Sequence, residues 1–169
     1  IVKFSYKDSR GRARSGELAP FVILMYRQGL YVVGARVGDD YASDDLRDWR
    51  RGLGVFAVER FVEAEQLRKR TFAIPPDFQI DEVLHGAFGV HVGDPANARR
   101  VVVEFTAEKA HLVTGRIWHP TQELKRGAGG RVHLSFTCTK LMPVVSWVLQ
   151  WGPHAKVIEP SELAFMIVD

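Results

Sequence analysis

Residues 20–36 constrain the fold most, because they combine two apolar, β-prone runs with a short polar turn. Phe21 to Tyr26 is the first run and Leu30 to Val33 the second, and the turn lies at 27–29. Pro20 lacks a backbone N–H, so we expect it to open the first strand. The spacing predicts a β-hairpin around which the N-terminal part of the chain is organised.

Aromatic and cationic side chains are grouped on this hairpin. Tyr26 and Tyr31 flank the turn, Arg27 lies within it, and Arg36 follows Gly34. Rings and guanidinium groups on a rigid sheet can stack on bases and neutralise phosphates. The alternative is that both tyrosines are half-buried strand residues.

Four segments carry a resemblance to a known family. Leu30-Tyr31-Val32 resembles the Trp-Tyr-Leu signature of WYL-domain proteins, and Phe56 to Phe61 resembles that family's Phe-Arg-Leu-Asp-Arg-Ile strand. Trp118-His119-Pro120-Thr121-Gln122 resembles the Trp-His-Pro-Ser-Gln segment of its C-terminal extension, WCX. Trp147 to Pro160, followed by Leu163, resembles the motif that closes the extension.

The resemblance implies a fold and a biological role. It implies an Sm-like or SH3-like barrel followed by the WCX extension, in a ligand sensor of a bacterial transcription regulator. Some WYL proteins respond to single-stranded DNA during DNA damage. Their usual helix-turn-helix or winged-helix domain would precede Ile1, so we expect this chain to be a fragment. Ala57 stands where the family usually has an Arg, so one phosphate contact would be lost or moved to Arg36, Arg27 or the 38–54 loop.

The element pattern agrees with a mixed α+β protein in two domains. Residues 1–72 contain five short predicted strands with basic loops, which suits a small barrel. The last two strands are expected over 55–61 and 62–72, although the composition of 62–72 would also suit a helix, and a short helix is expected near 44–50. Residues 73–96 form a linker with an amphipathic helix over 78–88, whose apolar stripe we expect to dock on a neighbouring domain. Residues 97–169 alternate as βαββαβ, including an extended edge at 116–119, which predicts a ferredoxin-like fold.

The positive charge lies in the first part of the chain. Residues 1–72 hold 14 Lys and Arg against 10 Asp and Glu, a net charge of +4, whereas the remainder has a net charge of −1. Arginine predominates over lysine there, and its planar fork suits phosphate. Three basic clusters stand out, each of which is alternatively a solvated surface: Arg10, Arg12 and Arg14; Arg47, Arg50 and Arg51; and Arg68, Lys69 and Arg70. The aspartates of the 39–48 loop are expected to neutralise part of the second cluster.

The sequence offers little to catalysis. It contains no phosphate-binding glycine loop, nucleophile elbow, HExxH or CxxC motif, and its six histidines are scattered. We therefore expect no enzyme activity, no catalytic residue, no metal and no cofactor. The single cysteine, Cys138, is interpreted as a buried thiol. No apolar run approaches the ~20 residues that span a bilayer, so we expect no membrane contact. The family resemblance implies a location in the bacterial cytoplasm at the nucleoid.

In the second domain, three side chains form a further candidate set. Trp118 beside His119 and Gln122 can stack on a base and hydrogen-bond its edge, adding to the barrel's site. Alternatively, Trp118 is core and His119-Pro120 a capped turn. Trp147 and Trp151, at helical spacing, are core residues or dimer anchors.

These patterns predict the effector-sensing region of a regulator that binds single-stranded DNA or a short oligonucleotide. The predicted contacts are Tyr6, Arg14, Arg27, Tyr31, Arg36, Arg60, Trp118, His119 and Gln122. The expected partners are the oligonucleotide, promoter duplex through the preceding DNA-binding domain, and a second copy in a homodimer. The alternatives are a sensor of a small anionic nucleotide and a protein-interaction module.

Overall fold

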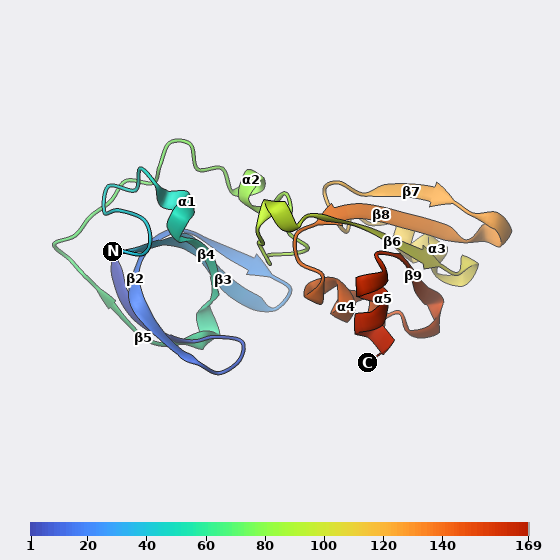
Figure 1. Ribbon diagram of the computed structural model, residues 1–169, viewed down its shortest axis with the longest axis horizontal. Helices are drawn as coiled ribbons and strands as arrows, with labels where there is room; N and C mark the ends of the chain where they lie inside the picture. Colours follow the sequence, from blue (N-terminus) through green and yellow to red (C-terminus); the bar gives the residue numbers. More distant parts are fainter. Residues whose placement is uncertain (169) are drawn as a thin grey trace. The chain divides into compact units, whose positions relative to one another are not determined.

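The structure is a computed structural model that describes residues 1–168. The chain divides into two compact units, one from Ile1 to Phe78 and the other from Gln79 onward. Each unit contains one antiparallel sheet, so the protein is mixed α+β, as predicted. Figure 1 shows both sheets, with strands β2 to β9 labelled.

The first unit is a five-stranded antiparallel sheet with the order β4-β3-β2-β1-β5. Its elements are β1 (Val2–Lys7), β2 (Ala13–Tyr26), β3 (Gly29–Val37), α1 (Trp49–Gly52), β4 (Leu53–Ala57), the 3-10 turn η1 (Val58–Arg60) and β5 (Phe61–Gln66). Strands β4 and β5 are the two edges, and no strand pairing among residues 1–168 joins them into a closed barrel.

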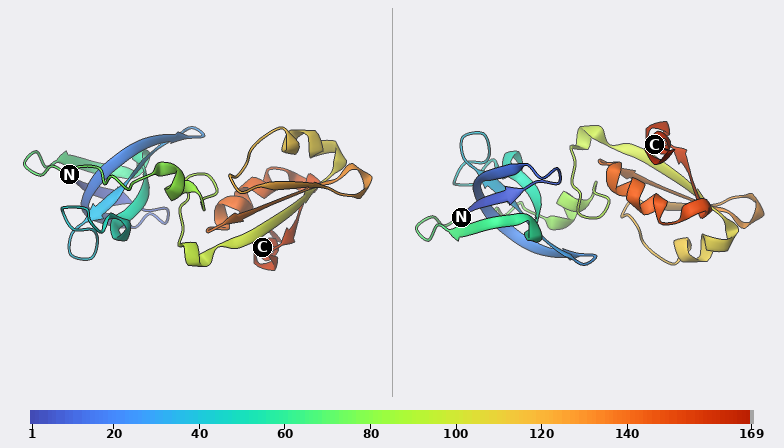
Figure 2. Two further views of the ribbon diagram at one scale, coloured as in Figure 1. Left: turned by 90° about the horizontal axis from the view of Figure 1, so that it is seen from above. Right: turned by 90° about the horizontal axis from the view of Figure 1, so that it is seen from below.

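The predicted hairpin is confirmed, with Arg27 and Gln28 forming the turn between Tyr26 and Gly29. Pro20 does not open its strand, because β2 begins at Ala13 and continues through the proline. The register of β2 against β3 shifts between Pro20 and Val22, and such a bulge accommodates a residue without an N–H. The hairpin extends beyond the neighbouring strands, as both views in Figure 2 show.

Gly34 faces this bulge and has to be a glycine. A Cβ there would lie 2.3 Å from the carbonyl oxygen of Ala19 and 2.9 Å from Cα of Pro20. The absence of a side chain therefore allows β2 and β3 to approach at the bulge.

Aromatic side chains fill both faces of this sheet. Phe4, Tyr6 and Leu18 form one buried cluster, against which Val32, Phe56 and Phe61 pack. On the other side, Phe21, Trp49, Phe72 and Phe78 pack ring against ring. The 38–54 loop and the segment leading to Phe78 thus cover a face of the sheet.

Three sequence predictions for this unit were imprecise. The strand predicted over 55–61 ends at Ala57 and gives way to η1, and the strand predicted over 62–72 is β5, which stops at Gln66. Leu67 to Arg70 is a turn, because Arg70 N–H donates to the Leu67 carbonyl. The short helix expected near 44–50 is α1, displaced to Trp49–Gly52.

The second unit has a four-stranded antiparallel sheet with the order β7-β8-β6-β9. Its elements are α2 (Ile80–Leu84), η2 (Pro95–Asn97), β6 (Arg99–Phe105), α3 (Ala107–Thr114), β7 (Glu123–Arg126), η3 (Ala128–Gly130), β8 (Val132–Cys138), α4 (Met142–Leu149), η4 (Gly152–His154), β9 (Ala155–Glu159) and α5 (Ser161–Val168). Helix α2 is shorter than the helix predicted over 78–88. The predicted edge at 116–119 is a loop, and the edge strand is β7.

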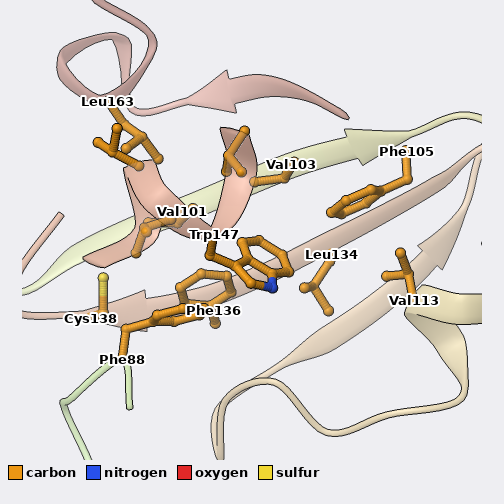
Figure 3. Close-up of a cluster of buried hydrophobic side chains, with 13 residues drawn as sticks. Phe88, Val101, Val103, Phe105, Val113, Leu134, Phe136, Cys138, Trp147 and Leu163 are labelled. Atoms are coloured by element: carbon orange, nitrogen blue, oxygen red, sulfur yellow. The ribbon is translucent and has the colours of Figure 1, made fainter. Parts of the chain in front are cut away.

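One hydrophobic core holds the second unit together. Strands β6 and β8 contribute alternate residues from Val101 to Phe105 and from Leu134 to Cys138, and the helices add Val113, Trp147 and Leu163. Figure 3 shows the Trp147 indole in the middle of this cluster. Trp147 is 1% exposed, so it is a core residue.

Candidate nucleic-acid interface

Arg36 is the most unusual cation of the first unit. It lies on β3 opposite Leu18 of β2, and its half-buried side chain runs along β2. Nη2 donates a hydrogen bond to the Ser15 carbonyl oxygen at 3.1 Å, and Nη1 donates to the Tyr41 hydroxyl at 2.7 Å. Gly16 provides the space, because a Cβ there would lie 3.1 Å from Nη2.

The positive charge of Arg36 is not balanced by an acid. No carboxylate in the described residues forms an ion pair with Arg36, and its buried Nε has no hydrogen-bond partner. By contrast, Arg70 pairs with both Glu17 and Asp44 at 2.6 Å. Since burying an uncompensated charge is costly, a half-buried guanidinium with only neutral acceptors is a candidate anion site.

Tyr41 completes the setting of Arg36. The guanidinium carbon lies 3.9 Å from the centre of the Tyr41 ring and 6.0 Å from that of Phe4. Tyr41 belongs to the 38–54 loop, which folds back so that Ala42 N–H donates to the Arg36 carbonyl at 3.0 Å. The sequence analysis missed Tyr41, because nothing in the local pattern indicates that this loop returns to β3.

Arg14 is the second predicted cation near this position. It lies on β2 opposite Tyr6, two residues before Gly16 and therefore on the same face. Its Nε contacts the Asp8 carboxylate at 3.4 Å. Asp8 also accepts hydrogen bonds from the N–H groups of Arg12 and Arg10, and the Arg12 bond is the largest cause of its lowered pKa.

Tyr6, predicted to contact the effector, is a core residue. It is 8% exposed, and its ring packs edge-on against Phe4, Phe56 and Phe61. The Tyr6 hydroxyl accepts the backbone N–H of Ala57 at 3.1 Å. A base therefore cannot stack on this ring, because other side chains already surround it.

The structure separates the remaining predicted contacts of this unit. Tyr31 and Arg36 are an odd number of positions apart on β3, so they face opposite sides of the sheet. Arg27 is at the hairpin turn, where its guanidinium carbon lies 5.5 Å from the centre of the Tyr26 ring. Arg60 is exposed and lies on η1, not on a strand. Of the four predicted cations and Tyr31, Arg14 and Arg36 lie on the same face of the sheet.

Several other cations are matched with acids. Arg47 pairs with Asp45 within the 38–54 loop, and the pKa of Asp45 is strongly lowered, chiefly by its hydrogen bond from the Arg47 side chain. Arg50 pairs with Asp77 at 2.6 Å. Arg36 therefore differs from Arg47, Arg50 and Arg70, each of which forms an ion pair with a carboxylate.

Trp118, His119 and Gln122 build a loop of the second unit. The side-chain oxygen of Gln122 accepts the N–H groups of Trp118 at 2.6 Å and His119 at 3.3 Å, while its Nε2 donates to the Arg116 carbonyl at 3.1 Å. The Trp118 indole N–H donates to the Val113 carbonyl at 3.0 Å, and its ring packs on Trp147. The alternative interpretation, a core tryptophan beside a stabilised turn, describes this loop.

His119 is enclosed by aromatic rings. It is 1% exposed and stacks on Phe136 with ring centres 5.2 Å apart and on Phe88 with centres 6.4 Å apart. Nδ1 accepts the Thr121 N–H at 3.1 Å. Burial is the main cause that lowers the pKa of His119, and the charge of His85 acts in the same direction. The imidazole is therefore held neutral and inside, where a ligand does not reach it.

Residues 1–168 contain neither a metal-binding cluster of side chains nor a helix suited to a membrane. Within residues 1–168, no group of three or more His, Cys, Asp or Glu side chains is placed to hold a metal ion. No helix of that part of the chain has the length and apolar character needed to cross a bilayer. Burial raises the pKa of the Cys138 thiol to about 11, so this cysteine is a core thiol.

Comparison with known proteins identifies the second unit. The WCX domain matches residues 97–169, and no curated protein matches the chain. Among solved structures, a CRISPR Cas-related protein is 14% identical with a TM-score of 0.58, covering 99% of this chain and 44% of that one. The proteasome accessory factor B/C (PafBC) of Arthrobacter aurescens is 20% identical with a TM-score of 0.40, covering 99% of this chain and 23% of that one. The chain thus spans less than half the length of either protein, and the WCX match is confined to residues 97–169.

Proposed function

We propose that this chain is the effector-sensing region of a WYL-type transcription regulator and that its first unit binds single-stranded DNA. The observation that carries the proposal is the half-buried Arg36 guanidinium, which has two neutral acceptors and no acid partner. The WCX match supports a regulatory sensing role. Binding would shift an attached DNA-binding domain between two states through different affinities for the effector.

The strand orders support the finer fold assignments that we propose. In the second unit the order β7-β8-β6-β9, with α3 and α4 in the connections, is that of a ferredoxin-like sheet. In the first unit, η1 turns the chain from β4 to β5, and β5 pairs with β1. A sheet in which consecutive strands turn back to pair with β1 in this way supports a small Sm-like or SH3-like barrel that is open between β4 and β5.

A single strand suits the site better than a duplex. Arg36 is recessed between β2, the 38–54 loop and Phe4, so a phosphate has to approach it closely. A flexible single strand can bend a phosphate into such a position, whereas the phosphates of a duplex are fixed on a rigid helix.

We propose that the regulator acts as a homodimer at the nucleoid in the bacterial cytoplasm, in the response to DNA damage. We also propose that it contacts promoter duplex through its other domain.

One observation favours a second candidate, a small anionic nucleotide. Of the predicted cations, Arg14 and Arg36 lie on the same face of the sheet, and Arg14 already contacts Asp8. A site with one unpaired guanidinium can be filled by one phosphate group. A protein-interaction module is favoured by the exposed apolar side chains of the hairpin, Ile23, Met25 and Leu30.

The test is a fluorescence-anisotropy titration of labelled single-stranded DNA at two salt concentrations, with duplex DNA of the same sequence for comparison. Arg36→Ala should lower the affinity about tenfold or more, because hydrogen bonds to a charged group contribute about 1.5–3 kcal/mol. Arg47→Ala is the matched control, since it removes the same charge from an exposed arginine paired with Asp45. Absence of binding at low salt, or equal losses in the two variants, would contradict the proposal.

A further inference from the structure

Arg36 has few N–H groups left with which to contact a ligand. A guanidinium has five N–H donors, of which Arg36 uses one on Nη1 for Tyr41 and one on Nη2 for the Ser15 carbonyl. Nε is buried and out of reach. One N–H on each Nη nitrogen remains, and both lie in the plane of the guanidinium.

The flat faces of the guanidinium are less available than its plane. The group lies over the Tyr41 ring at 3.9 Å, and the Phe4 ring is within cation–π range at 6.0 Å. A nucleobase that stacked on Arg36 would have to compete with these rings. An oxyanion that accepts two in-plane hydrogen bonds would not, because bidentate acceptance uses the edge of the fork.

We infer that Arg36 is a preset fork for one phosphate of the nucleic-acid backbone and does not read a base, with Tyr41 and Gly16 as the residues that position it. The inference rests on the proposed function and assigns the chemistry of its central contact. The phosphodiester of an oligonucleotide and the phosphate of a mononucleotide share this chemistry.

Backbone contacts fix Tyr41 in place before any ligand arrives. Tyr41 N–H donates to the Gly38 carbonyl at 2.9 Å, and Gly38 N–H donates to the Ala42 carbonyl at 3.1 Å. Ala42 in turn binds the backbone of Arg36, so the ring is tied to the residue that it orients. Fixing a long side chain in advance reduces the entropy lost on binding and so favours affinity.

The acceptors around Arg36 orient it without neutralising it. A hydroxyl and a carbonyl oxygen accept hydrogen bonds but carry no net charge, so the full positive charge remains for the ligand. Gly16 keeps the place of Nη2 free, and an alanine there would push the fork aside without changing the net charge.

The test compares a natural single strand, an abasic strand of equal length and a mononucleotide, each titrated with the full chain and its variants. We expect the abasic strand to bind within about threefold of the natural one, since phosphate contacts carry no sequence information. Arg36→Lys should lose about tenfold although it keeps the charge, because an ammonium cannot form the bidentate pair. The mononucleotide should not displace the strand at micromolar concentration.

The positioning residues need a readout that loss of structure would not produce. Tyr41→Leu should weaken binding while the thermal unfolding midpoint stays unchanged. Tyr41→Phe should bind with an affinity between those of the unmodified chain and Tyr41→Leu, because it keeps the ring but removes the hydroxyl that accepts from Nη1. Gly16→Ala should weaken binding too, and it should also lower the midpoint, because Gly16 has a φ of +159°. Arg36→Ala should reduce the slope of log affinity against log salt by about 0.7, the value for one phosphate contact on a single strand.

The outcomes separate the two claims. If the natural strand binds but the abasic strand does not, or if Arg36→Lys binds like the unmodified chain, Arg36 does not form the inferred bidentate phosphate contact. The proposed function, binding of single-stranded DNA, then still stands. If a mononucleotide displaces the strand at micromolar concentration, the fork serves a free nucleotide and the backbone assignment is wrong. If no strand binds, the proposed function itself fails.

Discussion

Tyr6→Phe tests whether Tyr6 closes the open side of the first sheet. Ala57 ends β4, an edge strand, so its N–H has no strand partner on the side away from β3. The Tyr6 hydroxyl accepts this N–H at 3.1 Å and thereby links β1 to β4 across the gap. Ala57 is 3% exposed, so water does not replace the hydroxyl easily.

The magnitude follows from what the substitution keeps and removes. Phenylalanine keeps the ring contacts with Phe4, Phe56 and Phe61, so little packing is lost. The substitution leaves a buried N–H without an acceptor, which costs about 1–3 kcal/mol. We therefore expect the free energy of unfolding of the first unit to fall by that amount, with a decrease of its unfolding midpoint by roughly 4–8 °C per kcal/mol for a unit of this size.

Two measurements check this expectation in the full chain. Thermal unfolding gives the change in midpoint, and amide hydrogen exchange should show faster exchange of the Ala57 N–H in the variant. Tyr26→Phe is the matched control, because Tyr26 is half-buried and its hydroxyl has no hydrogen-bond partner among the described residues. A change below about 0.5 kcal/mol, the usual range for neutral surface substitutions, with unaltered exchange at Ala57 would refute the reasoning.

Three further predictions concern the stability of the two units. Gly34→Ala should destabilise the first unit by about 3 kcal/mol, the upper end for overpacking, because its Cβ would meet the Ala19 carbonyl; urea unfolding measures it. Lowering the pH below 6.5, the ordinary pKa of histidine, should destabilise the second unit, because burial lowers the pKa of His119 and the unfolded chain is then protonated first. The loss is at most about 1.4 kcal/mol per pH unit until the pH reaches the folded pKa, and His119→Gln should remove that part of the slope in urea titrations. Gln122→Ala should lower the unfolding midpoint of the second unit by removing the acceptor of two backbone N–H groups, and an anisotropy titration should find strand binding unchanged.

Local signals in the sequence were sufficient for the hairpin and for most strands. The polar turn at Arg27 and the apolar runs beside it determine their structure within a few residues of sequence. Pro20 was misplaced because a bulge depends on the partner strand, and Gly34 on that strand is what permits it. Helix α5 was not expected, since the predicted βαββαβ order ends in a strand.

The site was predictable in residue type but not in arrangement. Arg14 and Arg36 were predicted because arginine suits phosphate, whereas the contact of Tyr41 with Arg36 depends on a loop that returns to β3. The alternation of the first strand did contain a warning about Tyr6, because it puts Tyr6 on the same face as Phe4. Two aromatic residues on one face of a strand more often form a core than a stacking surface.

The residues that carry the family resemblance serve the fold more than the ligand. Gln122 stabilises its loop, and Trp118 and Trp147 pack against each other in the core of the second unit. The motif residues named here therefore have structural contacts in this unit. Ala57 stands where the family usually has an arginine, and its residue is 3% exposed while its backbone N–H donates to the Tyr6 hydroxyl. Under the proposed function, Arg36 supplies a phosphate contact in place of that arginine, because its guanidinium has neutral acceptors and no acid partner. The proposal therefore assigns the ligand contact to a residue outside the motifs that carry the family resemblance.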